Sequence, residues 1–176
     1  MFAAASRRRV EPAEAAAVGA AAPLELVGVF VNENVARIAS HAAALDLAAV
    51  QLHGDESRED VATLRRLLPA SCAIWKAAPG RAPLPLRESF GADRVLLDGA
   101  APGSGRVFDW GLLDAYPETR EAVLAGGLDP ENACAADRLG AWALDVSSGV
   151  EEAPGRKSDA RLAAFLAALR GQGRSA

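Results

Sequence analysis

Short apolar runs alternate with longer stretches of helical period along almost the whole chain, and this rhythm constrains the fold more than any other feature. The spacing of the runs is that of a strand–helix unit with short loops. Because the runs are nearly continuous in apolar character, they predict parallel strands that are buried on both faces. The chain is therefore expected to be an α/β protein. The six candidate strands are Leu26–Val31, Ala49–His53, Ala73–Lys76, Arg94–Asp98, Ala122–Ala125 and Trp142–Val146.

The stretches that lie around these strands are rich in Ala, Leu and Arg and predict the helices. A length of 176 residues favours one domain over residues 1–176. The expected helices are Pro12–Ala22, Glu33–Leu45, Ser57–Leu68, Trp110–Tyr116, Pro130–Leu139 and Asp159–Arg170, together with a Pro-rich piece from Pro79 to Phe90.

Two architectures accommodate this rhythm: a doubly wound open sheet and a closed (βα)8 barrel. The segments VLLDG, VLAGG and LDVSSG each place Gly, Asp or Ser at the carboxyl end of a strand. Functional groups at every strand end are typical of a barrel, whereas a doubly wound sheet concentrates them at one switch point. The strand ends favour the barrel, although six strands are found where a barrel needs eight.

Composition excludes several classes of partner and site. The net charge of −4 argues against a nucleic-acid partner, and no apolar run is long enough to cross a membrane. Arg7–Arg9 follow small residues rather than precede an apolar run, which is the wrong order for a secretory signal and favours a cytoplasmic protein. Cys72 and Cys134 are far apart and predict reduced packing cysteines rather than a metal or redox motif.

Glycine-rich strand ends in the last third of the chain indicate an anion site. Gly126-Gly127 follow one strand and Ser147-Ser148-Gly149 follow the next, while Pro102-Gly103-Ser104-Gly105 could add another wall. Free backbone N–H groups at such positions form an anion nest, and barrels often bind phosphate there. The alternative is that these loops are only tight turns.

Asp98 and His53 are the titratable candidates at strand ends. Asp98 closes the run RVLLD, and an apolar wall should raise its pKa and suit it to act as a general acid. A helix cap or an ion pair with Arg106 is an equally good interpretation of Asp98, and hydrogen bonding to its own loop is as good for Asp145. His53 has no second histidine nearby, since His41 falls in a helix, so no metal site is predicted.

Five segments, in this order and spacing, resemble the phosphoribosylanthranilate isomerase family. The resemblance covers essentially the whole chain and implies a (βα)8 TIM barrel and an enzyme of tryptophan biosynthesis. The implied reaction is the Amadori rearrangement of N-(5-phosphoribosyl)anthranilate to 1-(2-carboxyphenylamino)-1-deoxyribulose 5-phosphate, without cofactor or metal. The segments are GVFVN at 28–32, VQLHGDE at 50–56, LLDG with PGSGRVFDW at 96–99 and 102–110, LAGGLDPEN at 124–132, and DVSSGVE with PGRK at 145–151 and 154–157.

The resemblance also implies roles for individual residues. Asp98 matches the general acid that protonates the furanose ring oxygen, and His53 matches a residue that lines the substrate pocket. Arg8 matches the arginine that binds the anthranilate carboxylate, although Arg7 and Arg9 stand where the family usually has Pro and Tyr. Pro102 replaces a common glycine. The residues that match the phosphate loops are Gly103, Gly105, Gly126, Gly127, Ser147, Ser148 and Gly149.

The chain departs from the family at its start. The family opens with a strand ending in K-I-C-G, whose cysteine is the general base, and Met1-Phe2 aligns with the tail of the second strand. We therefore expect an incomplete barrel with strands three to eight, whose open edges favour self-association. A non-catalytic phosphate-binding fragment is the alternative function. The related indole-glycerol-phosphate synthase is disfavoured because its lysine-rich strand ends are missing and QLHGDE is present.

Overall fold

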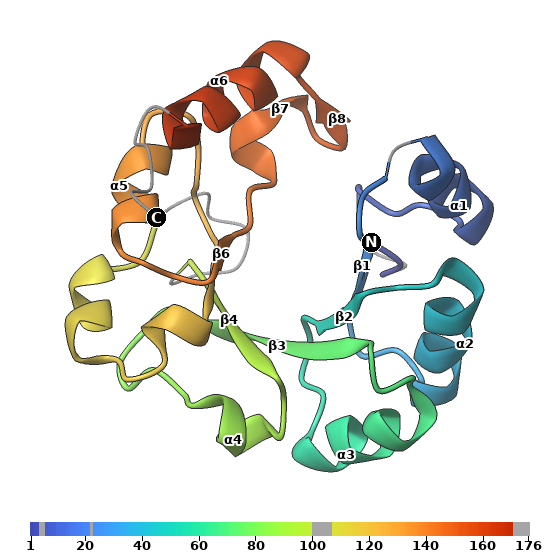
Figure 1. Cartoon of the computed structure of the whole chain (residues 1–176). Helices are drawn as coiled ribbons and strands as arrows, with labels where there is room; N and C mark the ends of the chain where they lie inside the picture. Colours follow the sequence, from blue (N-terminus) through green and yellow to red (C-terminus); the bar gives the residue numbers. More distant parts are fainter. Residues whose placement is uncertain (4–5, 22, 100–106, 171–176) are drawn as a thin grey trace. The chain divides into compact units, whose positions relative to one another are not determined.

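The computed structural model describes residues 1–3, 6–21, 23–99 and 107–170 (Figure 1). The chain divides into two compact units, and each is described by itself. The first unit contains Met1–Ala77 and Leu86–Val95, and the second contains Ala78–Pro85 and Leu96–Ala176. The third and fourth strands each contribute residues to both units.

The six expected strands are all present and form one parallel sheet in chain order. The structure thus confirms the α/β class and the six-stranded part of a TIM-barrel fold. Neighbours in the order β1-β2-β3-β4-β5-β6 are hydrogen-bonded. The strands are β1 (Val27–Phe30), β2 (Ala49–Leu52), β3 (Ala73–Pro79), β4 (Arg94–Asp98), β5 (Val123–Leu124) and β6 (Ala143–Leu144).

In the first unit, alternate residues of the strands face a buried apolar core. Val50 pairs with Gly28 and with Ile74, and Leu52 pairs with Phe30 and with Lys76. Val50, Leu52 and Ile74 are at most 1% exposed and pack with residues of the helices that follow the strands. Since side chains alternate across a strand, the intervening residues of β2, Ala49 and Gln51, belong to the opposite face of the sheet.

Helices α2 and α3 begin at side-chain caps that the sequence provides. Asn34 accepts hydrogen bonds from two amides at the start of α2 (Val35–Leu45), and Ser57 with Asp60 forms a capping box at the start of α3 (Arg58–Leu67). These caps satisfy amides that have no partner within the helix. Helix α1 (Pro12–Ala21) and the short α4 (Arg87–Phe90) complete the helices described in this unit.

Met1–Ala3 lie alongside β1. The amide of Phe2 donates to the carbonyl of Val29 at 2.9 Å, and the Phe2 ring stacks on Phe30 with 5.2 Å between centroids. The outer edge of β1 is therefore partly occupied, which corrects the expectation of a fully open edge there.

The second unit is built on β4, β5 and β6. Leu96 and Leu97 pair with Val123 and Leu124, which in turn pair with β6. Helix α5 (Ala133–Arg138) packs against α6 (Asp159–Arg170), and the 3-10 turns are η1 (Trp110–Ala115), η2 (Thr119–Glu121) and η3 (Ser148–Val150).

Two segments differ from the expectation. The Pro-rich piece from Pro79 to Phe90 is helical only over α4, because Pro83 and Pro85 lack the amide donors that a helix needs. An antiparallel pair, β7 (Glu151–Ala153) and β8 (Arg156–Lys157), lies between η3 and α6 and was not predicted. Its turn contains Pro154-Gly155, with Gly155 at φ 84°.

Over the described ranges, none of the helices is both long enough and apolar enough to cross a membrane.

Candidate functional site

The carboxyl ends of β4 and β5 bring Asp98 beside Gly126. Asp98 is half-buried, and its Oδ1 accepts a hydrogen bond from the Gly99 amide at 2.8 Å. A Cβ added at Gly126 would lie 2.6 Å from this same oxygen and would overlap the Gly99 amide. Gly126 is therefore required by close packing, and the structure places the predicted general acid next to the predicted anion loop.

Gly126 and Gly127 both adopt a left-handed backbone conformation. Their φ angles are 80° and 68°, a region in which a side chain is strained. Asn132 Nδ2 donates to the Gly127 carbonyl at 2.8 Å, so this carbonyl is already bound. Over residues 1–3, 6–21, 23–99 and 107–170, the amides of the two glycines donate to no other residue. These two amides are therefore candidate donors to a ligand.

The loop after β6 packs directly on the glycine loop. A Cβ at Gly149 would overlap the Leu128 carbonyl, so the two backbones touch at this point. Ser147 and Ser148 are exposed, and Gly149 is half-buried. The structure therefore brings Asp98 beside the Gly126-Gly127 loop and packs the Ser147–Gly149 loop against the segment that follows it.

Two of the predicted phosphate ligands, Gly103 and Gly105, lie outside the described residues, as do Pro102 and Arg106. The structure places Asp145 directly after β6, where its amide donates to the Leu124 carbonyl at 2.8 Å.

His53 and Arg8 belong to the first unit. His53 follows β2, is half-buried, and its Nδ1 lies 3.0 Å from Gln51 Nε2. The Arg8 amide donates to Ser6 Oγ at 3.1 Å, and the residue is half-buried, whereas Arg9 is exposed and pairs with Glu11 at 2.7 Å.

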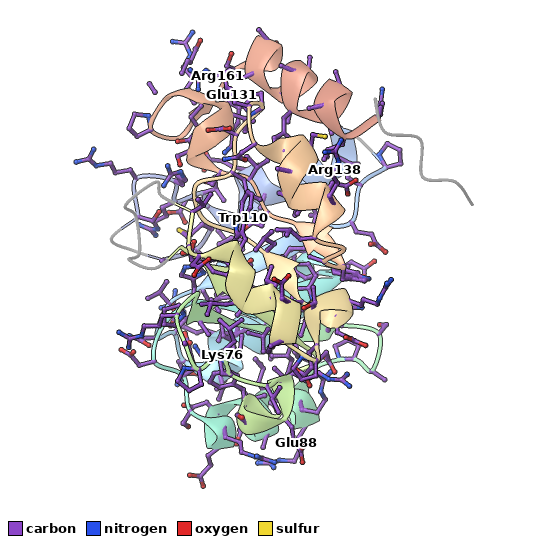
Figure 2. All side chains as sticks on the ribbon, turned by 90° about the vertical axis from the view of Figure 1, so that its left-hand side faces the viewer. Lys76, Glu88, Trp110, Glu131, Arg138 and Arg161 are labelled. Carbon is purple, nitrogen blue, oxygen red and sulfur yellow. The ribbon has the colours of Figure 1, made fainter. Side chains whose placement is uncertain are left out.

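A buried ion pair beside His53 was not predicted from the sequence. Glu56 and Lys76 lie 3.2 Å apart, and each side chain is 5% exposed (Lys76 is labelled in Figure 2). Glu56 accepts from the amides of Asn32 and Gly54, while Lys76 donates to the Gly54 carbonyl at 2.6 Å. The pair thus joins the loops after β1 and β2 to strand β3. A lysine in an otherwise apolar strand was the available signal, since buried charges need partners.

Neither cysteine lies at the carboxyl end of a strand. Cys72 precedes β3 and is 2% exposed, and burial raises the pKa of its thiol above the ordinary value. Cys134 lies on α5. A buried thiol with a raised pKa is protonated at neutral pH and is a poor base. Among the described residues, no group of three or more His, Cys, Asp or Glu side chains could hold a metal ion.

Comparison with known proteins identifies the family with which this site agrees. The family model of N-(5'-phosphoribosyl)anthranilate (PRA) isomerase matches residues 1–168. The tryptophan biosynthesis protein TrpCF of Yersinia pestis is 44% identical over 97% of this chain. The crystal structure of phosphoribosyl anthranilate isomerase from Thermus thermophilus is 36% identical, with a TM-score of 0.85, over 97% of this chain and 85% of that one.

A further solved structure of this family contains a phosphorylated ligand. It is a phosphoribosyl anthranilate isomerase in complex with reduced 1-(o-carboxyphenylamino)-1-deoxyribulose 5-phosphate, and it is 32% identical with a TM-score of 0.77 over 97% of this chain and 85% of that one. The chain spans 36% of the length of the Yersinia protein, so it corresponds to about a third of that relative.

Proposed function

Because this chain belongs to the N-(5'-phosphoribosyl)anthranilate isomerase family, we propose that it serves the isomerisation of N-(5-phosphoribosyl)anthranilate in tryptophan biosynthesis. The product is 1-(2-carboxyphenylamino)-1-deoxyribulose 5-phosphate. The observation that carries the proposal is the packing of Gly126 against the carboxylate of Asp98, because it puts an acid beside a loop whose glycine amides donate to none of the described residues. The same arrangement suits a substrate with a phosphate at one end and a sugar ring beside it.

Asp98 acts in this proposal as the general acid. Its carboxyl group gives a proton to the furanose ring oxygen, the bond from that oxygen to C1′ breaks, and a Schiff base forms. Removal of the C2′ proton then gives the enolamine, which becomes the ketose. A general acid of this kind contributes about 10²- to 10⁴-fold to the rate. The half-buried position of Asp98 supports this role, since it is reachable yet shielded.

We assign the parts of the substrate to separate groups of residues. The amides of Gly126, Gly127, Ser147, Ser148 and Gly149 take the phosphate, with Gly103 and Gly105 as further donors. Arg8 binds the anthranilate carboxylate, and His53 lines the pocket. A guanidinium group suits a carboxylate because it can donate two parallel hydrogen bonds.

The general base is not assigned to either cysteine of this chain. The sequence contains no K-I-C-G segment, and the positions of Cys72 and Cys134 exclude them as bases at a strand end. The non-catalytic alternative has no independent observation in its favour. We also propose that residues 1–176 act as one domain and that the protein is cytoplasmic.

Turnover of N-(5-phosphoribosyl)anthranilate tests the proposal in three proteins. The first is the 176-residue chain. The second carries a strand ending in K-I-C-G fused ahead of Met1, and the third is this fusion with Asp98→Asn. We expect the fusion to exceed the printed chain by at least about 10²-fold, and Asp98→Asn to lose about as much while substrate still binds. The exposed Asp114→Asn is the matched control and should leave turnover unchanged.

Near-normal turnover in the Asp98→Asn fusion would remove Asp98 from the mechanism. Full activity in the 176-residue chain would instead show that another residue serves as the base, and His53 is the first to examine.

A further inference from the structure

Three carbonyl groups in the Gly126-Gly127 loop and the Ser147–Gly149 loop accept hydrogen bonds from side chains. The Gly127 carbonyl accepts from Asn132 Nδ2 at 2.8 Å, and the Ser147 carbonyl accepts from Lys157 Nζ at 2.9 Å. The Gly149 carbonyl accepts from Arg161 Nη1 at 3.2 Å (Arg161 is labelled in Figure 2). Three side chains from outside the loops therefore engage the negative ends of three loop peptides.

This pattern matters because the two ends of a peptide group point in opposite directions. A loop binds an anion with its N–H groups only when its carbonyl oxygens point elsewhere and have their own partners. The amides of Ser147, Ser148 and Gly149 donate to no other residue within the described ranges. Of these amides, only that of Ser148 shares its peptide group with a carbonyl bound by one of these side chains, that of Ser147, so the Lys157 donor on the carbonyl side holds the Ser148 N–H in the orientation that an anion requires.

Lys157 reaches Ser147 because the unpredicted hairpin returns it there. Glu151 and Lys157 are direct partners across β7 and β8, and their side chains form an ion pair at 3.1 Å. The Glu151 side chain is only 5% exposed, so its carboxylate is held by the fold, whereas Lys157 is 46% exposed. Glu151 thus anchors the ammonium group against the Ser147 carbonyl.

Resting on the proposed phosphate site, we propose that Lys157, anchored by Glu151, is a positioning residue that orients the Ser147–Gly149 loop for phosphate. Two of the three donors of its ammonium group are directed at Ser147 and Glu151. The lysine therefore acts through the backbone. Substitution of Glu151 distinguishes this positioning role from a direct contact between Lys157 and phosphate. Loss of its negative charge should strengthen a direct lysine–phosphate contact, whereas it should weaken a loop that depends on an anchored lysine.

Calorimetric titration with inorganic phosphate tests the proposal on the 176-residue chain. We expect Lys157→Met to weaken phosphate binding by about tenfold or more, the size expected for a charge-assisted hydrogen bond. Glu151→Gln should weaken it as well, although it removes a negative charge. Arg156→Met is the matched control, because Arg156 precedes Lys157 and pairs with the exposed Glu152. It should bind phosphate as the unaltered chain does.

Amide chemical shifts distinguish a positioning role of Lys157 from a general effect on stability. Phosphate should shift the amides of Gly126, Gly127 and Ser148 in the unaltered chain, and the shift at Ser148 should be lost in Lys157→Met while that at Gly126 persists. Circular dichroism shows whether each variant is folded, and Lys157→Arg, which keeps the charge and a donor, should restore part of the affinity.

Three results would overturn the inference: tighter binding by Glu151→Gln, unchanged binding by Lys157→Met, or equal weakening by Arg156→Met. Failure of the unaltered chain to bind phosphate is a distinct outcome, since it removes the proposed phosphate site itself and this inference with it.

Discussion

Removal of either member of the buried ion pair between Glu56 and Lys76 should cost the first unit several kcal/mol. Both side chains are 5% exposed, and Lys76 makes contacts of 2.6 to 3.3 Å with Glu56 and with the carbonyls of Gly54 and Ala77. Lys76→Met leaves the Glu56 carboxylate buried with only backbone amides as partners. Removal of one member of such a pair typically costs about 3–5 kcal/mol.

A double-mutant cycle measures the pair itself. Lys76→Met and Glu56→Gln should each reduce the free energy of unfolding by about 3–5 kcal/mol. The double variant should lose about 2 kcal/mol less than the sum of the two, because neither charge is then left without its partner. The exposed pair Glu33–Arg37, with nitrogen and oxygen 3.9 Å apart, is the control, and Arg37→Met should cost less than about 0.5 kcal/mol.

Urea unfolding followed by tryptophan fluorescence is the appropriate assay. Trp75 precedes Lys76 on β3, whereas Trp110 and Trp142 belong to the second unit. A background with Trp110→Phe and Trp142→Phe therefore reports the first unit alone. A free energy of unfolding for Lys76→Met within about 0.5 kcal/mol of the background protein would contradict this expectation. Simple addition of the two single losses in the double variant would contradict it as well.

Three further outcomes follow from the structure. Gly126→Ala should destabilise the second unit by more than the roughly 1 kcal/mol of its positive φ alone, because the new Cβ meets Gly99, and urea unfolding measures the loss. Hydrogen bonds from Ser57 lower the pKa of Asp60. The stabilising effect of the Asp60 carboxylate is therefore present above about pH 4 and is lost as the pH falls. Asp60→Asn should be less stable than the unaltered chain at pH 7, and this difference in stability should vanish in acid. Iodoacetamide should modify Cys134 in the folded chain and Cys72 only after unfolding, and labelling of Cys72 at an equal rate would contradict its burial.

The sheet could be predicted from the sequence because each buried parallel strand is a nearly continuous apolar run. β4 has the predicted bounds Arg94–Asp98, whereas β5 and β6 are shorter than predicted, since only two residues of each enter the ladder. The hairpin of β7 and β8 carries the charged sequence EEAPGRK and has no apolar alternation. Its turn residues Pro154-Gly155 were the available signal, because such a dipeptide marks a turn.

The site was predictable where it depends on the backbone and obscure where it depends on side chains that donate to loop carbonyls. Glycines at the strand ends pointed to Gly126 and Gly149, and the structure shows that both approach other backbones too closely for a side chain. The roles of Asn132 and Lys157 could not be derived in this way. Each side chain donates to a backbone carbonyl that the folded loops bring close to it. The spacing of residues in the sequence does not predict these contacts.

The proposal assigns the phosphate and the anthranilate carboxylate to different residues. Asp98, Gly126 and Ser148 belong to the second unit, whereas Arg8 and His53 belong to the first. Inorganic phosphate engages only the groups of the second unit in our proposal, so Arg8→Ala should leave its affinity unchanged and should weaken binding of the full substrate. Gly126→Ala should weaken both ligands. Weakened phosphate binding by Arg8→Ala would show that the arginine belongs to the phosphate site, and the assignment of the anthranilate carboxylate to it would then be wrong.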